Sequence, residues 1–311
     1  MSCPRWFLIL NGKAAGNPGV RAAVHALRQR GVDLQVRVTW EAGDEARWVD
    51  EAVAAAADTI IAGGGDGTLG AVAGAMARRE ERAEALPTLG VLPLGTANDF
   101  AAAAQLPVAP AEALALVEAA PAVAIDLLRV RGDGHTRWCI NMVSGGFGTE
   151  VTRDTDERLK KALGGFAYFL TGLTRLGRIE PIQARLHGED FAWDGGFVAL
   201  GIGNGRQAGG GQVLCPQACI DDGEIALTVI PDLQDVVGTL GKLVADGQQA
   251  ALEHAAVRVA LAALAVDAPQ ALTLNLDGEP LAARHFEIVC DPGRVRMHLP
   301  PDCPLLAAAA A

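Results

Sequence analysis

Short apolar runs alternate with alanine-rich stretches of helical period along the first 125 residues. The apolar runs predict strands at 6–10, 34–38, 59–62 and 89–92, and the stretches between them predict helices at 18–30, 44–57 and 69–79. Repeated strand–helix units of this kind indicate a parallel sheet with helices packed on its faces. Ligands of such sheets bind at the carboxyl ends of the strands.

The pattern changes after about residue 125, where long alanine-rich helical stretches become rare. Strand-like alternation appears at 138–142, 183–186, 197–201, 224–230, 272–276, 286–289 and 295–299, with glycine and aspartate clusters between the runs. This texture is typical of an antiparallel sheet. We therefore expect an α/β domain with a parallel sheet over 1–125 and a mostly antiparallel, sandwich-like β domain over 126–290, with the tail 290–311 rejoining the first domain.

Composition and charge exclude several classes of protein. Half of the 311 residues are hydrophobic and the mean hydropathy is +0.22, which is too apolar for a disordered chain. No apolar run reaches the roughly 18–20 residues of a membrane span, and the run at 6–10 is shorter than the core of a secretion signal. The net charge of −11 argues against nucleic acid as a partner. A cytoplasmic protein is expected.

One segment departs from this acidic background. Residues 151–180 hold six Arg or Lys against four Asp or Glu, around the apolar run GGFAYFLTGL. Such a segment is either a core helix with a charged flank or an element that faces a membrane. Both interpretations stay open from the residues alone.

The strongest chemical signal is the segment IIAGGGDGTLGAVAGA at 60–75. A strand ends, glycines and one aspartate follow, and a helix begins, so backbone N–H groups at the helix start face an anion. This arrangement predicts a phosphate-binding loop, and four glycines exceed what an ordinary tight turn requires. Asp66 inside the loop fits a site that also holds a cation and a transferring phosphoryl group.

The same loop formally matches the dinucleotide fingerprint G-x-G-x-x-G at 65–70. That fingerprint normally follows the first strand, whereas this loop lies in the third strand–helix unit. The next strand runs into Pro93 and ends without an acidic residue for a ribose. An oxidoreductase is therefore the less favoured alternative.

Polar residues also follow the other strands of the predicted sheet. In the segment LGVLPLGTANDFA at 89–101, Thr96 offers a hydroxyl to a nucleotide, and Asn98 or Asp99 is a candidate helix cap. Polar or small residues likewise lie at 11–13 and at Thr39, where the first two strands end. One site at the carboxyl edge of the sheet would use all of them.

The motif GGGDGT followed by PLGTANDFA closely resembles the diacylglycerol kinase catalytic family, lipid kinases related to sphingosine kinases and more distantly to NAD kinases. The likeness to its bacterial lipid kinases covers nearly the whole chain. It continues through NMVSGGFGT at 141–149, GIGNGRQAGGGQ at 201–212, CPQACIDDGEIAL at 215–227, NLDGEP at 275–280 and LPPDCPLL at 299–306. GGGDGT alone is shared with NAD kinases, whereas the later segments are more specific.

The resemblance implies an ATP site in the first domain. Its residues would be Thr39, Gly65, Asp66, Gly67, Thr68, Leu69, Gly70, Ala71 and Thr96. The family usually has Asn and Glu where this chain has Gly70 and Ala71. Because those two side chains are missing, weaker ATP binding or a shifted nucleotide is expected.

The resemblance also implies a metal site and a proton acceptor in the β domain. Mg²⁺, or alternatively Ca²⁺, would be held around Cys219, through its backbone carbonyl, and by Asp222 and Glu224, while Asp277 would accept the proton. From the residues alone, Asp222 and Asp277 are equally consistent with ordinary turn aspartates. Oxygen-rich turns also suit hard cations, and a carboxylate can take the proton of an alcohol.

The implied activity is an ATP- and Mg²⁺-dependent phosphorylation of a glycerolipid hydroxyl, with phosphatidylglycerol as the favoured acceptor. Diacylglycerol or another lipid alcohol is the first alternative. A soluble acceptor, as in NAD kinases, or a non-catalytic nucleotide or lipid sensor are the others. The expected partners are ATP and a membrane glycerolipid, reached by transient contact with the inner face of the membrane. The oligomeric state stays open.

Overall fold

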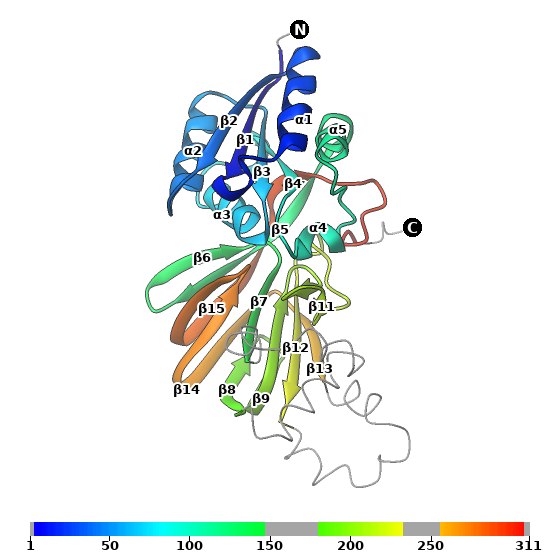
Figure 1. Cartoon of the computed structure of the whole chain (residues 1–311). Coiled ribbons are helices and arrows are strands. Elements are labelled where there is room, and N and C mark those ends of the chain that lie inside the picture. The colour runs from blue at the N-terminus through cyan, green and yellow to red at the C-terminus, as the bar shows by residue number, and fades with distance from the viewer. Residues whose placement is uncertain (1–2, 147–179, 233–255, 308–311) are drawn as a thin grey trace.

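The computed structural model describes residues 3–146, 180–232 and 256–307 (Figure 1). Helices gather in the upper half of Figure 1, around the N-terminal strands, and long strands fill the lower half. None of the helices in these three ranges is long and apolar enough to cross a bilayer.

The N-terminal half is a parallel sheet with helices on both faces. Its strands β1 (Arg5–Asn11), β2 (Asp33–Thr39), β3 (Thr59–Gly64) and β4 (Thr88–Pro93) lie in the order β2-β1-β3-β4. Its helices are α1 (Pro18–Gln29), α2 (Asp44–Ala54), α3 (Asp66–Ala77), α4 (Asp99–Ala103) and α5 (Pro110–Ala119), with short 3₁₀ turns η1 (Gly12–Ala14) and η2 (Ala83–Ala85).

Alternation along β1 explains why both faces are covered. Phe7 and Ile9 join the buried cluster that α2 and α3 complete. Leu8 and Leu10 point the other way, into the cluster formed with α1 and α5. Successive side chains of a strand face opposite sides of a sheet, so a fully apolar strand requires apolar helices on both sides.

The remaining strands form an antiparallel continuation of the same sheet. They are β5 (Ala122–Gly132), β6 (His135–Cys139), β7 (Met142–Gly146), β8 (Ile182–His187), β9 (Ala192–Gly203), β12 (Ile225–Pro231), β13 (Val257–Leu261), β14 (Ala263–Leu276) and β15 (Glu279–His298), plus a small hairpin of β10 (Gln207–Ala208) and β11 (Gln212–Val213). All neighbours among the larger strands pair in antiparallel fashion. The predicted fold class is therefore confirmed.

One strand differs from the expectation. The sequence pattern predicts two strands at 286–289 and 295–299, whereas β15 passes through both runs without ending. Its register against β5 shifts between Asp291 and Val295, and Gly293 there has a φ of +59°. A bulge with a glycine in this conformation lets a strand bend and continue. Beyond it, Met297 pairs in parallel with Leu89 of β4.

A cation from β15 fixes the far end of helix α3. The Arg294 guanidinium donates to the carbonyl of Ala77 at 2.7 Å, to that of Glu81 at 3.0 Å, and to that of Arg79. It also lies 5.9 Å from the ring centroid of Trp138 in β6. The last carbonyls of a helix have no partner within the helix and carry partial negative charge, so a cation satisfies both needs.

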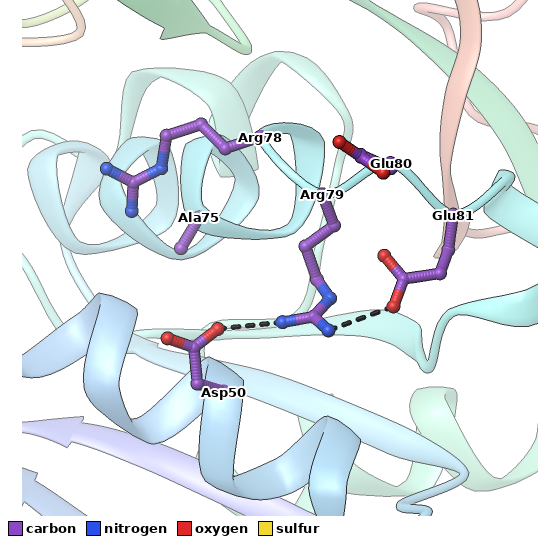
Figure 2. Close-up of a pocket in the computed structure, with 6 residues that line it drawn as sticks. All are labelled: Asp50, Ala75, Arg78, Arg79, Glu80 and Glu81. Carbon is purple, nitrogen blue, oxygen red and sulfur yellow. Dashed lines mark hydrogen bonds and ion pairs between the residues drawn. The ribbon is translucent and has the colours of Figure 1, made fainter.

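A second arginine anchors the same turn from the other side. Arg79 forms ion pairs with Asp50 of α2 at 2.7 Å and with Glu81 at 2.9 Å (Figure 2). These groups line a hollow of about 660 Å³ beyond the end of α3. Both arms of the Arg79 guanidinium are used within it, so the hollow serves the packing of α3 against α2.

Replacing Arg294 with leucine should lower the free energy of unfolding by about 2–3 kcal/mol, because three carbonyls lose a charged donor. Arg296→Leu is the matched control, since its Nε atom is buried without a partner among the described residues. Denaturant unfolding followed by circular dichroism measures both. Equal losses in the two variants would show that Arg294 does not hold the helix.

Candidate active site

The glycines between β3 and α3 are mostly required by packing. A Cβ on Gly63 would lie 2.9 Å from Leu8, and one on Gly64 would collide with the side chain of Thr68. A Cβ on Gly65 would approach the backbone of Gly95 at 3.1 Å. The number of glycines is therefore not itself evidence of phosphate binding, because a close-packed turn needs three of them.

Gly67 is the exception. The nearest atom to a Cβ placed there is the backbone oxygen of Asp277, at 3.9 Å. Gly67 thus opens onto free space at the start of α3, where N–H groups have no partner inside the helix. This opening faces the turn that carries the predicted proton acceptor.

Asp66 has a structural partner that the sequence did not reveal. Its carboxylate accepts hydrogen bonds from the backbone N–H groups of Asp99, at 2.9 Å, and Phe100, at 3.0 Å. It therefore caps α4, and neither candidate cap of that helix does so. Asn98 instead closes its own turn, bonding both the N–H and the carbonyl of Gly95 at 2.8 and 2.9 Å.

The Asp99 carboxylate reaches across to the β domain. It is buried and accepts from the backbone N–H groups of Gly210, at 2.9 Å, and Gly211, at 2.6 Å. Both glycines have positive φ, which lets the β10–β11 hairpin turn its amides toward the carboxylate. Two successive carboxylates thus tie the glycine-rich loop to α4 and α4 to the β domain.

The polar ends of the first two strands lie beside the loop. The Asn11 side-chain amide donates to the Thr68 hydroxyl at 3.1 Å, and Asn11 pairs with Thr39 across β1 and β2. Thr39 is buried, whereas Thr96 is exposed on the loop after β4. Leu69 packs into the core beneath α3. Its side chain therefore does not contribute to a ligand site.

A cavity of about 560 Å³ lies between the two halves of the chain. Four segments line it: residues 42–46, one face of α3, residues 136–138 of β6, and the turn 276–281 between β14 and β15. Of the predicted ATP residues, the cavity brings together Gly65, Gly67, Thr68, Gly70 and Ala71. Thr39, Asp66, Leu69 and Thr96 do not line it.

Asp277 enters the cavity from the β14–β15 turn, with a φ of +49°. Its carboxylate accepts from the backbone N–H groups of Ile140, Asn141 and Met142 at 2.7, 3.0 and 3.1 Å. The Cys139 thiol donates to it at 3.1 Å. The expectation of a single strand at 138–142 is wrong: β6 ends and β7 begins there, because the amides turn toward the carboxylate.

Burial raises the pKa of the Asp277 carboxyl above its ordinary value, and the hydrogen bonds from Ile140 and Cys139 oppose the rise. Burial and the adjacent carboxylate also raise the pKa of the Cys139 thiol well above its usual range. Cys139 therefore remains a protonated donor. A raised pKa makes Asp277 a better proton acceptor than an exposed aspartate.

Helix α3 is pressed against this carboxylate at Gly70. A Cβ on Gly70 would lie 2.9 Å from Oδ2 of Asp277 and 3.0 Å from its Cβ. The asparagine usual in the family does not fit this arrangement without displacing Asp277. The glycine is thus the counterpart of the close approach, whereas Ala71 is exposed toward the cavity.

The predicted metal residues lie in another place. Cys219, Asp222 and Glu224 belong to the segment before β12 and do not line the cavity. Oδ1 of Asp222 accepts from the backbone N–H of Glu224 at 3.0 Å. Within the ranges that the structure describes, no group of three or more His, Cys, Asp or Glu side chains has metal-binding geometry.

A carboxylate that sequence reasoning missed stands beside them. Asp126 in β5 accepts from Gly223 and Gly293 N–H groups, each at 2.7 Å. Burial, together with the charges of Asp222 and Asp221, raises its pKa. Burial and the charge of Asp221 raise the pKa of Asp222 as well. The only signal in the sequence is one aspartate within an apolar strand.

A second missed residue connects this region to Asp277. Asn204 is fully buried, and its amide donates to the carbonyls of Asp126 and Ile140 at 2.9 and 2.7 Å. Ile140 in turn donates to Asp277. The expected membrane-facing segment 151–180 lies, up to residue 179, outside the described residues, as does the end of 141–149.

Comparison with known proteins identifies the family. The model of the diacylglycerol kinase catalytic domain matches residues 5–130, and that of the YegS C-terminal NAD kinase beta sandwich-like domain matches residues 141–299. A crystal structure of a diacylglycerol kinase from Bacillus anthracis shares the fold, with a TM-score of 0.70 and 22% identity over 97% of this chain and 99% of that one.

Two relatives carry the name "Probable lipid kinase YegS-like". The one from Stenotrophomonas maltophilia is 61% identical over 307 residues, covering 98% of this chain and 99% of the relative. The one from Pseudomonas aeruginosa is 54% identical over 299 residues, covering 96% and 95%. With both family models and these full-length relatives matched, the chain belongs to the diacylglycerol kinase catalytic family, in the group with a YegS-type C-terminal domain.

Proposed function

We propose that this kinase transfers the γ-phosphoryl group of ATP to the hydroxyl of a glycerolipid, with phosphatidylglycerol as the favoured acceptor. One observation carries the proposal: the same cavity holds the opening at Gly67 and the carboxylate of Asp277. A phosphate at the start of α3 and an alcohol beside Asp277 would then meet in one enclosed space. The lipid-kinase names of the relatives support a lipid acceptor.

In this reaction the acceptor oxygen forms a bond to the γ-phosphorus, and the bond from that phosphorus to the bridging oxygen of ADP breaks. Asp277 takes the proton that the hydroxyl loses. Backbone N–H groups at the start of α3 stabilise the phosphates. The protein mainly positions the two substrates, since phosphoryl transfer needs orientation and charge stabilisation rather than covalent help.

A divalent cation, Mg²⁺ or Ca²⁺, would bind through the Cys219 carbonyl, Asp222 and Glu224. The mutual effect of Asp126, Asp221 and Asp222 on their pKa values indicates an excess of negative charge that a cation would neutralise. Because these residues lie outside the cavity, such an ion would stabilise the turn rather than contact the γ-phosphate. Mg²⁺ bound to ATP would supply charge neutralisation at the phosphates.

We assign ATP to residues 1–125 together with the tail 290–311, and the lipid to residues 126–290. The reaction would take place at the cytoplasmic face of the membrane, where both substrates are available. Diacylglycerol is the second candidate acceptor, on the strength of the catalytic-domain match.

Transfer of labelled γ-phosphate from ATP to lipids in mixed micelles tests the activity. We expect label in phosphatidylglycerol, less in diacylglycerol, and none in NAD as the soluble control. Labelling of NAD without labelling of any lipid would contradict the proposal and indicate an acceptor of the NAD-kinase type.

Asp277→Asn should lower kcat by about 10²–10⁴, the usual cost of a lost general base. The substitution is not neutral for the fold. If the amide oxygen replaces Oδ1, the amide NH₂ faces the Ile140 N–H across a contact that is now 2.7 Å, so a loss of about 1–3 kcal/mol in stability is expected. Assays therefore run below the melting temperature of the variant, with ATP binding measured separately. Near-parent turnover would leave Asp277 as a turn residue only.

Gly70→Ala should reduce kcat at least tenfold, because the new methyl group displaces the Asp277 carboxylate. Gly74→Ala is the matched control: it adds the same group one turn later on α3, where the nearest atom is Cβ of Trp138 at 3.4 Å, an ordinary contact. Alanine favours a helix over glycine by about 0.5–1 kcal/mol, so neither backbone is weakened. Equal turnover in the two variants would show that α3 does not constrain Asp277.

A further inference from the structure

Two cations of the cavity have no partner among the described residues. The charged residues that line the cavity are Glu45, Arg78, Arg137, Asp277 and Glu279. Arg78 and Arg137 are exposed, and no hydrogen bond or ion pair joins either guanidinium to another residue of the described ranges. Arg79, the next residue along, forms two ion pairs (Figure 2). Arg78 and Arg137 are therefore available to bind a ligand.

Arg78 lies on the same face of α3 as the glycines at the site. Gly67, Gly70, Gly74 and Arg78 follow one another at intervals of three or four residues, and all four line the cavity. In Figure 2 the Arg78 side chain extends back along the helix, on the side away from the ion pairs of Arg79. Helical side chains generally lean toward the N-terminus in this way. The guanidinium is thus directed toward the end of α3 that holds Asp277.

Arg137 approaches from the β domain. It precedes Trp138, whose Cβ lies 3.4 Å from the position of a Cβ on Gly74. Strand β6 therefore rests on the middle of the cavity-lining face of α3 and places Arg137 beside the same space. The two arginines come from different halves of the chain and border one cavity.

The dimensions suit a short headgroup. The eight residues from Gly70 to Arg78 span about 12 Å along the helix axis. An arginine side chain that runs back along the helix covers about half of this distance. In a phosphatidylglycerol headgroup, five bonds separate the phosphorus from the terminal hydroxyl, about 6 Å when extended. A phosphodiester at Arg78 would therefore place that hydroxyl near Asp277.

The charges favour an anionic acceptor over a neutral one. When substrates fill the cavity and displace water, a neutral alcohol would leave two guanidinium groups without a counter-charge, which is costly. A phosphodiester supplies that charge, and guanidinium groups bind phosphate oxygens through two parallel hydrogen bonds. The three carboxylates of the cavity cannot bind phosphate themselves.

We propose that Arg78 and Arg137 bind the phosphodiester of an anionic glycerophospholipid and so orient its headgroup hydroxyl toward Asp277. This proposal rests on the proposed lipid kinase activity and specifies its acceptor class. It makes Arg78 and Arg137 specificity-determining residues that discriminate phosphatidylglycerol from diacylglycerol, which has no phosphate.

The test compares Arg78→Ala, Arg137→Ala and the double variant with Arg21→Ala. Arg21 is an exposed arginine of α1 outside the cavity and controls for the general attraction of cations to anionic micelles. Each single variant should raise KM for phosphatidylglycerol about tenfold to a hundredfold, as expected for a lost charge-assisted hydrogen bond. KM for ATP and turnover of diacylglycerol should stay within about twofold of the parent.

Three outcomes would overturn the proposal. A rise in KM for ATP would assign the arginines to the nucleotide phosphates. Equal losses with phosphatidylglycerol and diacylglycerol would remove the specificity role. An equal effect of Arg21→Ala would reduce the arginines to surface charge.

A binding measurement separates this proposal from the proposed activity. Calorimetric titration with sn-glycero-3-phosphoglycerol, the headgroup without acyl chains, requires no turnover. The parent should bind it and the double variant should bind it at least tenfold more weakly. If the parent labels no lipid at all, the proposed function fails while this result still supports a phosphodiester site. Absence of binding by the parent, or equal binding by the double variant, overturns the site itself.

Discussion

The hydrogen bonds to the Asp277 carboxylate are the constraint on which the rest of the site depends. Three consecutive amides and one thiol donate to this single group, and they do so at the point where β6 ends and β7 begins. The strand is broken because these amides bond the carboxylate rather than a neighbouring strand. Gly70 then allows α3 to lie directly against it. Strand break, turn conformation and glycine follow from one buried charge that needs donors.

Helix α3 is held at both ends, so its cavity-lining face has a fixed position. At its start, Asp66 caps α4, and Asp99 of α4 binds the β10–β11 hairpin. At its end, Arg294 of β15 binds the last carbonyls. Each contact joins a charged side chain to several backbone groups, which are strong and directional interactions. The two halves of the chain therefore meet along α3 in a defined geometry, and the cavity lies at this junction.

The sequence predicted the local elements well where periodicity alone decides them. The parallel strands and helices of the first half, the antiparallel second half and the family are confirmed. Long-range contacts could not be predicted. The break at 140–141 depends on Asp277, more than 130 residues away, and β15 continues through Pro292 and Gly293 because a bulge absorbs them. The capping role of Asp66 and the buried Asp126 and Asn204 likewise depend on partners distant in sequence. The assigned roles of the site residues and the domain boundaries stay predictions.

Hydrogen exchange at the amides of Ile140, Asn141 and Met142 tests the central claim most directly, because these N–H groups bond the Asp277 carboxylate instead of another strand. In the parent protein they should exchange as slowly as the amides of β7 and β9. In Asp277→Asn they should lose protection selectively, while amides of β1 and β3 keep theirs. Fast exchange of the three amides in the parent, or unchanged protection in the variant, would contradict the account.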